Sequence, residues 1–380
     1  QLIPQRRHGR QPGHLVTGHR ADHIARQQII HQDDGGAEPE GDGYLVSGQK
    51  IFISWGDHQM TPNIVHLVLA RLPDAPPGVK GISLFLVPKY LLDDSGEPVA
   101  ERNGVNVLSL EHKMGLHGSP TCVMDFDNAK GYLIGEPHKG LMHMFTMMNH
   151  ARQAVGVQAL GVAERASQQS LMYSRDRLQG TRKDGSRIPI IEFPDVRRML
   201  LTMKSTAEAM RAIALVAAGQ MDRARASGDA DDMALAELYT PIVKGWITEI
   251  ANEMASIGVQ IHGGMGFVEE TGAAQHMRDV RVFAIYEGTN GIQALDFIGR
   301  KTLMNEGKAL QTLLEQMQAT HESLKGNTDL PGSVVDAFGA ALAAGADSRR
   351  TVLTEAANDK AMAPTVAYHF MMQFGYLTGA

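Results

Sequence analysis

One stretch of the chain decides how the rest of the sequence is interpreted: residues 260–301, QIHGGMGFVEETGAAQHMRDVRVFAIYEGTNGIQALDFIGRK. It begins at the end of a helical pattern and continues into three glycines, Gly263, Gly264 and Gly266. Glycine has no side chain to cover the backbone, so the amide groups of this turn could approach a phosphate or an adenine closely. A turn that ends a helix needs no ligand, however, and the glycines alone favour that simpler interpretation.

The second feature of this stretch is Glu287, a single carboxylate in an otherwise apolar loop. It lies between Tyr286 and Gly288. A carboxylate in a loop is most often exposed to solvent. The pattern by itself therefore leaves the role of Glu287 open.

The composition indicates a large globular protein. Its 380 residues, 43% hydrophobic and 21% charged, are enough for two or three domains. The 36 basic and 42 acidic side chains leave a formal net charge of -6, which gives no general support for nucleic-acid binding. Cys122 is the single cysteine, which excludes an intramolecular disulfide bond and suits a reducing compartment. We therefore expect a cytoplasmic protein, and no membrane span, because no apolar run approaches the length of about 20 residues that a span requires.

Residues 41–132 have the pattern of a β domain. Short β-rich runs alternate with turn residues such as Asp42-Gly43 and Ser47-Gly48. The expected strands are residues 44–54, 63–72, 81–90, 105–110 and 121–126. Their spacing predicts a small antiparallel barrel or sandwich, which we assign to a domain of residues 38–136.

The pattern becomes helical after this domain. Long tracts without proline are rich in Ala, Leu, Met, Gln, Glu and Arg, and their apolar residues recur at spacings of three and four. We expect a four-helix bundle at residues 137–302 and a partial helical extension at residues 303–380, with a helix at residues 309–325. The predicted fold class is therefore α+β, an antiparallel β domain followed by a helical bundle and a helical extension.

The ordered motifs of residues 260–301 closely resemble the acyl-CoA dehydrogenase family. The family pattern of QxxGGxG, an MRD-like segment and YEGTxxIQ matches this stretch, and it places a carboxylate beside the flavin. The resemblance covers about residues 40–302. Its other motifs are SGQKIFIS, EHKMGLHGSPT, GEPHKGL and MMNHARQAVGVQALGVAERA. The tail after Lys301 resembles the longer members of the family with an additional C-terminal helical domain, among them broad-specificity and 3-methylmercaptopropionyl-CoA dehydrogenases.

This resemblance implies a reaction and its partners. The enzyme would use FAD to convert an acyl-CoA thioester into a trans-2-enoyl-CoA, with Glu287 removing the α-proton and the β-hydride passing to flavin N5. Typical members pass the electrons to an electron-transferring flavoprotein. Contacts between subunits at the FAD imply a homo-oligomer, either a dimer or a tetramer.

The resemblance also assigns site residues. It implies FAD contacts at Phe52, Ser54, Arg177, Gln260, Gly263, Gly264 and Thr289. It implies contacts with the acyl-CoA at Asn149, Arg152, Tyr286 and Gly288. Two departures weaken these assignments: the aromatic residue that usually follows Gln179 is absent, and Asn290-Gly291 replaces the usual Ser-Gln. We predict no metal site, because the histidines lack the spacing of metal ligands.

The ends of the chain depart from the family. A helical N-terminal domain and a TEPxAGSD-like segment precede the SGQK strand in the family, and neither occurs here. Residues 1–32 are instead rich in Arg, His and Gln, so we expect a leader at residues 1–37 that is disordered or out of frame. The apolar segment at residues 369–377 stops within three residues of the last one. We therefore expect a sequence truncated at both ends.

Three alternatives remain open at this point. An acyl-CoA oxidase would admit oxygen to the reduced flavin, and an inactive fragment or interaction module of the same family would not retain FAD. A DNA-associated flavoprotein of the superfamily would need a basic surface on the C-terminal extension. Residues 302–380 contain more acidic than basic side chains, which disfavours the last alternative.

Overall fold

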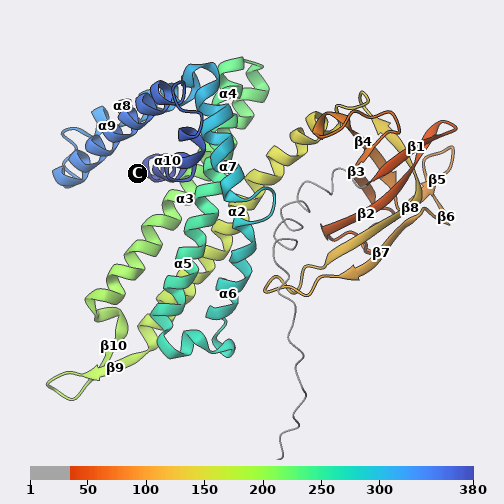
Figure 1. Ribbon diagram of the computed structural model, residues 1–380. Coiled ribbons are helices and arrows are strands. Elements are labelled where there is room, and N and C mark those ends of the chain that lie inside the picture. Colours follow the sequence, from red (N-terminus) through yellow and green to blue (C-terminus); the bar gives the residue numbers. More distant parts are fainter. Residues whose placement is uncertain (1–34) are drawn as a thin grey trace, which may run out of the picture. The chain divides into compact units, whose positions relative to one another are not determined.

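The computed structural model describes residues 35–380, which form two compact units (Figure 1). One unit comprises residues 35–112 and 118–146, and the other comprises residues 113–117 and 147–380. Most of the predicted leader, residues 1–34, lies outside the described residues. Residues 36 and 37, which the sequence analysis placed in the leader, begin the first strand.

The first unit is a small closed β-barrel. Its strands are β1 (Gly36–Glu40), β2 (Gly43–Ser54), β3 (Val65–Arg71), β4 (Ile82–Pro88), β7 (Val105–Leu110) and β8 (Thr121–Ile134). They are hydrogen-bonded in the order β2-β1-β3-β4-β8-β7, and an additional pairing of β2 with β8 closes the ring. All pairings are antiparallel except that of β1 with β3. A short hairpin of β5 (Tyr90–Leu92) and β6 (Pro98–Arg102) and the 3-10 turn η1 (Val79–Gly81) complete the unit.

The five strands predicted from sequence are confirmed, and the structure adds two features. Strand β1 has the sequence GAEPE, whose glycine, proline and two carboxylates are poor strand formers, so its pairing rather than its composition makes it a strand. Strand β8 continues eight residues beyond the predicted end. Asn128, with φ of 50°, lies in a β-bulge opposite β2, where its backbone N–H donates to the Ser47 hydroxyl.

The second unit is helical. Its helices are α2 (Gly140–Asp176, which starts within the residues of the first unit), α3 (Pro194–Ser227), α4 (Ala230–Pro241), α5 (Ile247–His262), α6 (Ala273–Val280), α7 (Asn290–Asp296), α8 (Lys308–Leu324), α9 (Gly332–Glu355) and α10 (Met362–Gly379). Two π-helical segments, η3 (Ile242–Trp246) and η7 (Phe297–Leu303), follow α4 and α7. Shorter 3-10 segments are η2 (Ile190–Glu192), η4 (Gly263–Phe267), η5 (Glu269–Thr271), η6 (Arg281–Ala284) and η8 (Met304–Gly307). Strands β9 (Leu178–Thr181) and β10 (Arg187–Pro189) form a hairpin between α2 and α3.

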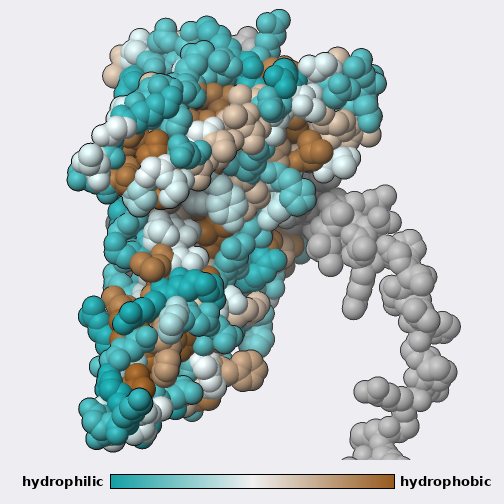
Figure 2. Space-filling view, turned by 90° about the vertical axis from the view of Figure 1, so that its left-hand side faces the viewer, coloured by the Kyte–Doolittle hydropathy of each residue, from teal (hydrophilic) through white to brown (hydrophobic). Residues whose placement is uncertain are grey.

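One hydrophobic core runs through this unit and includes the C-terminal helices. Helix α3 buries an apolar stripe at helical spacing, from Met199 through Met203, Ala207 and Met210. At the other end of the sequence, Phe370 and Phe374 of α10 pack against Phe297 of η7. The outer face in Figure 2 is mostly hydrophilic, with hydrophobic residues in small separate groups. The extension predicted at residues 303–380 is helical, as expected, and shares its core with the bundle.

The contact of α10 with η3 depends on a glycine. A Cβ atom on Gly375 would lie 2.2 Å from Cγ of Trp246, which is buried. The backbone of α10 can therefore approach the indole ring only because position 375 has no side chain.

We predict that Gly375→Ala destabilises the protein by about 1 to 3 kcal/mol, because the new methyl group must displace a buried indole ring. Urea denaturation followed by circular dichroism measures the effect. Gly219→Ala is the matched control, since it also lies inside a helix but its Cβ would meet no atom within 4 Å. The control should be neutral or stabilising by up to about 1 kcal/mol, and equal destabilisation by both variants would contradict this account of the packing.

Candidate active site

Glu287 lies in a strained loop between η6 and α7 of the helical unit. Its φ is 55°, and that of the following Gly288 is 86°, so two consecutive residues have left-handed backbone conformations. Such a conformation costs about 1 kcal/mol for a residue with a side chain, and strain of this kind concentrates at functional sites. Gly288 is required here, since a Cβ atom would lie 2.9 Å from Nε2 of Gln293.

Buried donors hold the carbonyl groups of this loop. Nε2 of Gln293 donates to the backbone oxygens of Glu287 and Gly288, at 3.3 Å each. Nε of Arg152, on α2, also donates to the Glu287 oxygen, at 3.2 Å. Gln293 is completely buried and Arg152 is 4% exposed. The loop is therefore fixed from its inner side by two side chains that solvent hardly reaches.

Two amide groups of the same loop are available as donors within the part of the chain that the structure describes. Among residues 35–380, no acceptor is found for the backbone N–H of Glu287 or Gly288. An unpaired N–H in a half-buried loop is a ready donor for an incoming carbonyl group.

Charged side chains surround the Glu287 carboxyl group. Burial raises its pKa, and the nearby positive charges of Arg152 and Lys244 only partly offset this effect. Burial also lowers the pKa of Arg152, and burial with repulsion from Arg152 lowers the pKa of Lys244 to about 8. The site thus holds one carboxyl group biased towards its neutral form, with two buried basic groups nearby.

The other residues assigned to the acyl-CoA lie on two elements around this loop. Asn149, on α2, accepts a weak hydrogen bond from Nη1 of Arg152, at 3.5 Å. The Tyr286 hydroxyl donates to Gln158, also on α2, and burial raises the pKa of Tyr286 to about 12. The Tyr286 ring stacks on Phe283 at 5.8 Å between ring centroids. The structure therefore brings Asn149, Arg152, Tyr286, Glu287 and Gly288 into one region.

Most of the residues assigned to FAD lie elsewhere in the helical unit. Arg177 follows the end of α2 and Gln260 lies near the end of α5, and the two helix ends are neighbours because Tyr173 stacks on His262 at 4.3 Å. Gly263 has φ of 60°, and a Cβ on Gly263 or Gly264 would meet no atom within 4 Å. This exposed backbone belongs to the end of the bundle beside β9 in Figure 1, whereas the Glu287 loop precedes α7.

The remaining FAD assignments fall at the start of α7 and in the barrel. Thr289 immediately precedes α7 and is half-buried. Phe52 has φ of 60° and is 62% exposed near the end of β2, where Ser54 is also exposed. An exposed aromatic ring held in a left-handed conformation suits stacking on a planar cofactor. Within the barrel, Phe52 and Ser54 therefore suit contact with a flavin ring.

Sequence reasoning missed part of the site. Lys244 is completely buried in η3, and Nζ donates to Oδ1 of Asn290 at 3.0 Å. The sequence signal was a single lysine in the apolar run TPIVKGW, which is easily taken for a surface position of an amphipathic helix. Gln293 was matched to the family motif without a role.

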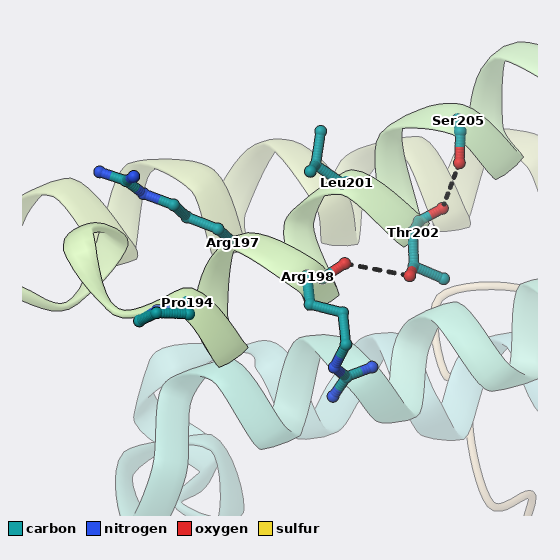
Figure 3. A pocket seen from close by; sticks show the side chains of 6 residues that line it. All are labelled: Pro194, Arg197, Arg198, Leu201, Thr202 and Ser205. Carbon is teal, nitrogen blue, oxygen red and sulfur yellow. Dashed lines mark hydrogen bonds between the residues drawn. The ribbon is translucent and has the colours of Figure 1, made fainter. Parts of the chain in front are cut away.

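A hollow on the outer face of α3 is not a candidate site. It is lined by Pro194, Arg197, Arg198, Leu201, Thr202 and Ser205 (Figure 3). Its hydroxyl groups donate to carbonyl oxygens of α3, and Arg198 pairs with Asp195 at 2.8 Å. Arg197 donates to the Ile191 oxygen of η2, so these polar groups are satisfied by nearby residues and do not converge on a ligand.

Comparison with known proteins identifies the family. Residues 138–303 match the family described as acyl-CoA dehydrogenase, C-terminal domain. The chain is 48% identical over 350 residues to 3-methylmercaptopropionyl-CoA dehydrogenase from Ruegeria pomeroyi, a match that covers 90% of this chain and 59% of the relative. The chain belongs to the acyl-CoA dehydrogenase family. It is also 40% identical over 320 residues to the broad-specificity linear acyl-CoA dehydrogenase FadE5 from Mycobacterium tuberculosis, covering 80% of this chain and 51% of that one.

Solved structures of acyl-CoA dehydrogenases have the same fold. ACDH-11 from Caenorhabditis elegans, in complex with C11-CoA, superimposes with a TM-score of 0.77 at 25% identity, covering 91% of this chain and 56% of that one. The acyl-CoA dehydrogenase from Bacillus anthracis complexed with FAD gives 0.70 at 25% identity, covering 91% and 57%. This chain spans about half the length of the curated relatives it matches.

The described residues contain neither a membrane-spanning helix nor a cluster of metal ligands. No helix within residues 35–380 is long and apolar enough to cross a membrane. No group of three or more His, Cys, Asp or Glu side chains in this part of the chain is arranged to hold a metal ion.

The raised pKa of Glu287 predicts a pH-dependent contribution to stability. A carboxyl group whose pKa is raised on folding binds its proton more tightly in the folded state, so its contribution is largest at low pH. The free energy of unfolding of the wild type, relative to Glu287→Gln, should therefore fall as pH rises above about 4.3, the ordinary value for Glu. Urea denaturation of both proteins from pH 4 to pH 8 measures it. Glu270→Gln, which removes an exposed carboxyl group, controls for the loss of one charge, and a rising difference would contradict the prediction.

Proposed function

We propose that this chain carries out the FAD-dependent α,β-dehydrogenation of an acyl-CoA thioester to a trans-2-enoyl-CoA, with Glu287 as the base. The observation that carries the proposal is the geometry of the Glu287 loop. A half-buried carboxyl group with a raised pKa lies beside two backbone N–H groups that have no acceptor among the described residues, in a loop that two buried side chains hold. Family membership supports the reaction class.

The geometry suits removal of a weakly acidic α-proton. Burial favours the neutral form of Glu287, so the carboxylate gains stability when it accepts a proton. The N–H of Glu287 can donate to the thioester carbonyl and so stabilise the negative charge that develops on its oxygen. Arg152 helps to hold the loop by donating to the Glu287 carbonyl oxygen.

The residues that would hold FAD are Phe52, Ser54, Arg177, Gln260, Gly263, Gly264 and Thr289. The exposed Phe52 ring and the open backbone at Gly263 and Gly264 support this assignment. Bound FAD would supply the acceptor of the β-hydride, at flavin N5. For the substrate we propose an acyl-CoA, with Asn149, Arg152, Tyr286 and Gly288 in the binding region.

The proposed partners and location follow from the relatives and the sequence. The chain is 31% identical to the caffeyl-CoA reductase–Etf complex subunit CarC from Acetobacterium woodii, which supports an electron-transferring flavoprotein as electron acceptor. We propose a homo-oligomer, because Arg177 and the open glycine turn lie at an exposed end of the bundle. A cytoplasmic location is proposed from the single, buried cysteine.

The direct test is the visible spectrum of the purified chain with FAD, before and after each acyl-CoA of a panel is added. The panel includes 3-methylmercaptopropionyl-CoA and butyryl-CoA, the substrates in the names of two relatives. Bleaching of bound flavin without oxygen supports the proposal. Consumption of oxygen during turnover would indicate an oxidase instead, and failure to retain FAD would favour the inactive fragment.

We predict that Glu287→Gln lowers the rate of flavin bleaching by about 10²- to 10⁴-fold and leaves the absorbance of bound flavin intact, because an amide cannot accept the α-proton. Stopped-flow absorbance in the absence of oxygen measures the rate. Glu270→Gln is the control and should bleach at the wild-type rate. Unchanged bleaching by Glu287→Gln would remove Glu287 as the base.

A further inference from the structure

The burial of Lys244 is energetically unfavourable. Its side chain is completely buried in η3, and burial of an ammonium group costs several kcal/mol unless charges or hydrogen bonds compensate for it. Within residues 35–380 it forms no ion pair within 4.0 Å, and its one hydrogen bond goes to the neutral amide of Asn290. An apolar residue would fill this position at less cost, so the charge calls for a functional reason.

Asn290 connects Lys244 to the Glu287 loop. It is the first residue of α7, three positions after Glu287, and is 5% exposed. Its Nδ2 donates to Oγ1 of Thr248 at 3.1 Å and to Oε2 of Glu249 at 2.7 Å. The Thr248 hydroxyl lies 2.7 Å from the Lys244 carbonyl oxygen, to which it can donate. The side chain that carries the charge is thus tied to the start of the helix that follows the proposed base.

The charges that face Lys244 come from three elements. Glu287 attracts its ammonium group from the loop, Glu249 attracts it from α5, and Arg152 repels it from α2. Glu249 also interacts with Tyr368 of α10, which packs against η3. Glu287 in turn is faced by Arg152 and Lys244 and by its neighbour Tyr286.

We propose that Lys244 is a positioning residue for the base: its buried ammonium group favours the ionised form of Glu287 and, through Asn290, holds the loop that presents the carboxylate. This inference rests on the proposed function. Without the ammonium group, the cost of burying an ionised Glu287 would be offset by Arg152 alone. Proton uptake by Glu287 removes the attraction that stabilises the lysine charge, so the protonation states of the two groups are coupled.

The first test does not depend on activity. The free energy of unfolding is measured against pH with and without Glu287→Gln, in the wild-type and Lys244→Met backgrounds. In the Lys244→Met background, the contribution of Glu287 to the free energy of unfolding should fall over a higher pH range. The midpoint of this fall should shift up by about half a pH unit or more. Lys244→Arg should restore the wild-type profile. If the contribution of Glu287 depends on pH in the same way in the wild-type and Lys244→Met backgrounds, the proposal is wrong.

Two further variants keep this test decisive. Lys244→Gln can still donate to Asn290 but has no charge, so it should give the same shift as Lys244→Met and serves if the apolar variant does not fold. Thr302→Val is the structural control: Thr302 is completely buried and its hydroxyl donates to the Phe297 oxygen at 2.9 Å. It should lower stability without moving the pH profile. A comparable shift in Thr302→Val would mean that any buried defect moves the profile, and the proposal would fail.

The second test uses flavin bleaching by the acyl-CoA that reduces the wild type. The acid limb of the rate against pH should move to higher pH in Lys244→Met and Lys244→Gln, and return in Lys244→Arg. If no acyl-CoA bleaches the wild type, the proposed function fails, whereas the stability profiles still decide the coupling of Lys244 to Glu287. An unmoved acid limb in an active Lys244→Met protein would contradict the role of the lysine.

Discussion

The inward hydrogen bonds of the Glu287 loop are the constraint on which the site depends. The left-handed conformation of Glu287 is unfavourable for a residue with a side chain, and hydrogen bonds from Gln293 and Arg152 to the loop carbonyl groups hold it in place. Within residues 35–380, the backbone N–H groups of Glu287 and Gly288 have no acceptor. Strain, carbonyl binding and free donors are therefore three aspects of one local geometry.

The buried donors exist because the helical unit has one continuous core. The π-helical segment η3 carries both Lys244 and Trp246, and α10 packs closely on this segment through Gly375. A Cβ on Gly245 would likewise lie 2.5 Å from Sδ of Met371, so α10 also lies close to the backbone beside Lys244. Helix α10 thus helps to exclude water from the segment that carries Lys244. Where water is excluded, the dielectric constant is lower, so charges interact more strongly than they would at the surface.

Charge balance in this region explains why burial does not simply neutralise the base. Burial alone favours the neutral form of a carboxyl group, and a proton acceptor must be ionised to act. Arg152 and Lys244 lower the pKa of Glu287 against the effect of burial, without cancelling it. In the proposed base, two positive charges favour the ionised form while burial favours proton uptake.

Much of the architecture could be predicted from local pattern. The β-rich runs between turn residues predicted β2, β3, β4, β7 and β8, because the residues of each run favour a strand without help from a partner. Strand β1 was missed because GAEPE becomes a strand only through its partners, and β8 was predicted too short because Asn128 signals a turn unless β2 pairs across the bulge. The helical extension was predicted from composition, but its shared core with the bundle was not.

The candidate site, too, was predicted from the sequence only in part. The motifs around Glu287 identified the proposed base and its loop, because a short ordered pattern can specify a loop and the helix that follows it. Lys244 and Asn290 are 46 positions apart, and nothing in the local sequence of either indicates the other. Only the packing of η3 against α7 brings them together. The sequence by itself determined the family, the order of the elements and the residue proposed as base; the tertiary structure decided which distant side chains set its charge, because burial and proximity arise only when the helices pack.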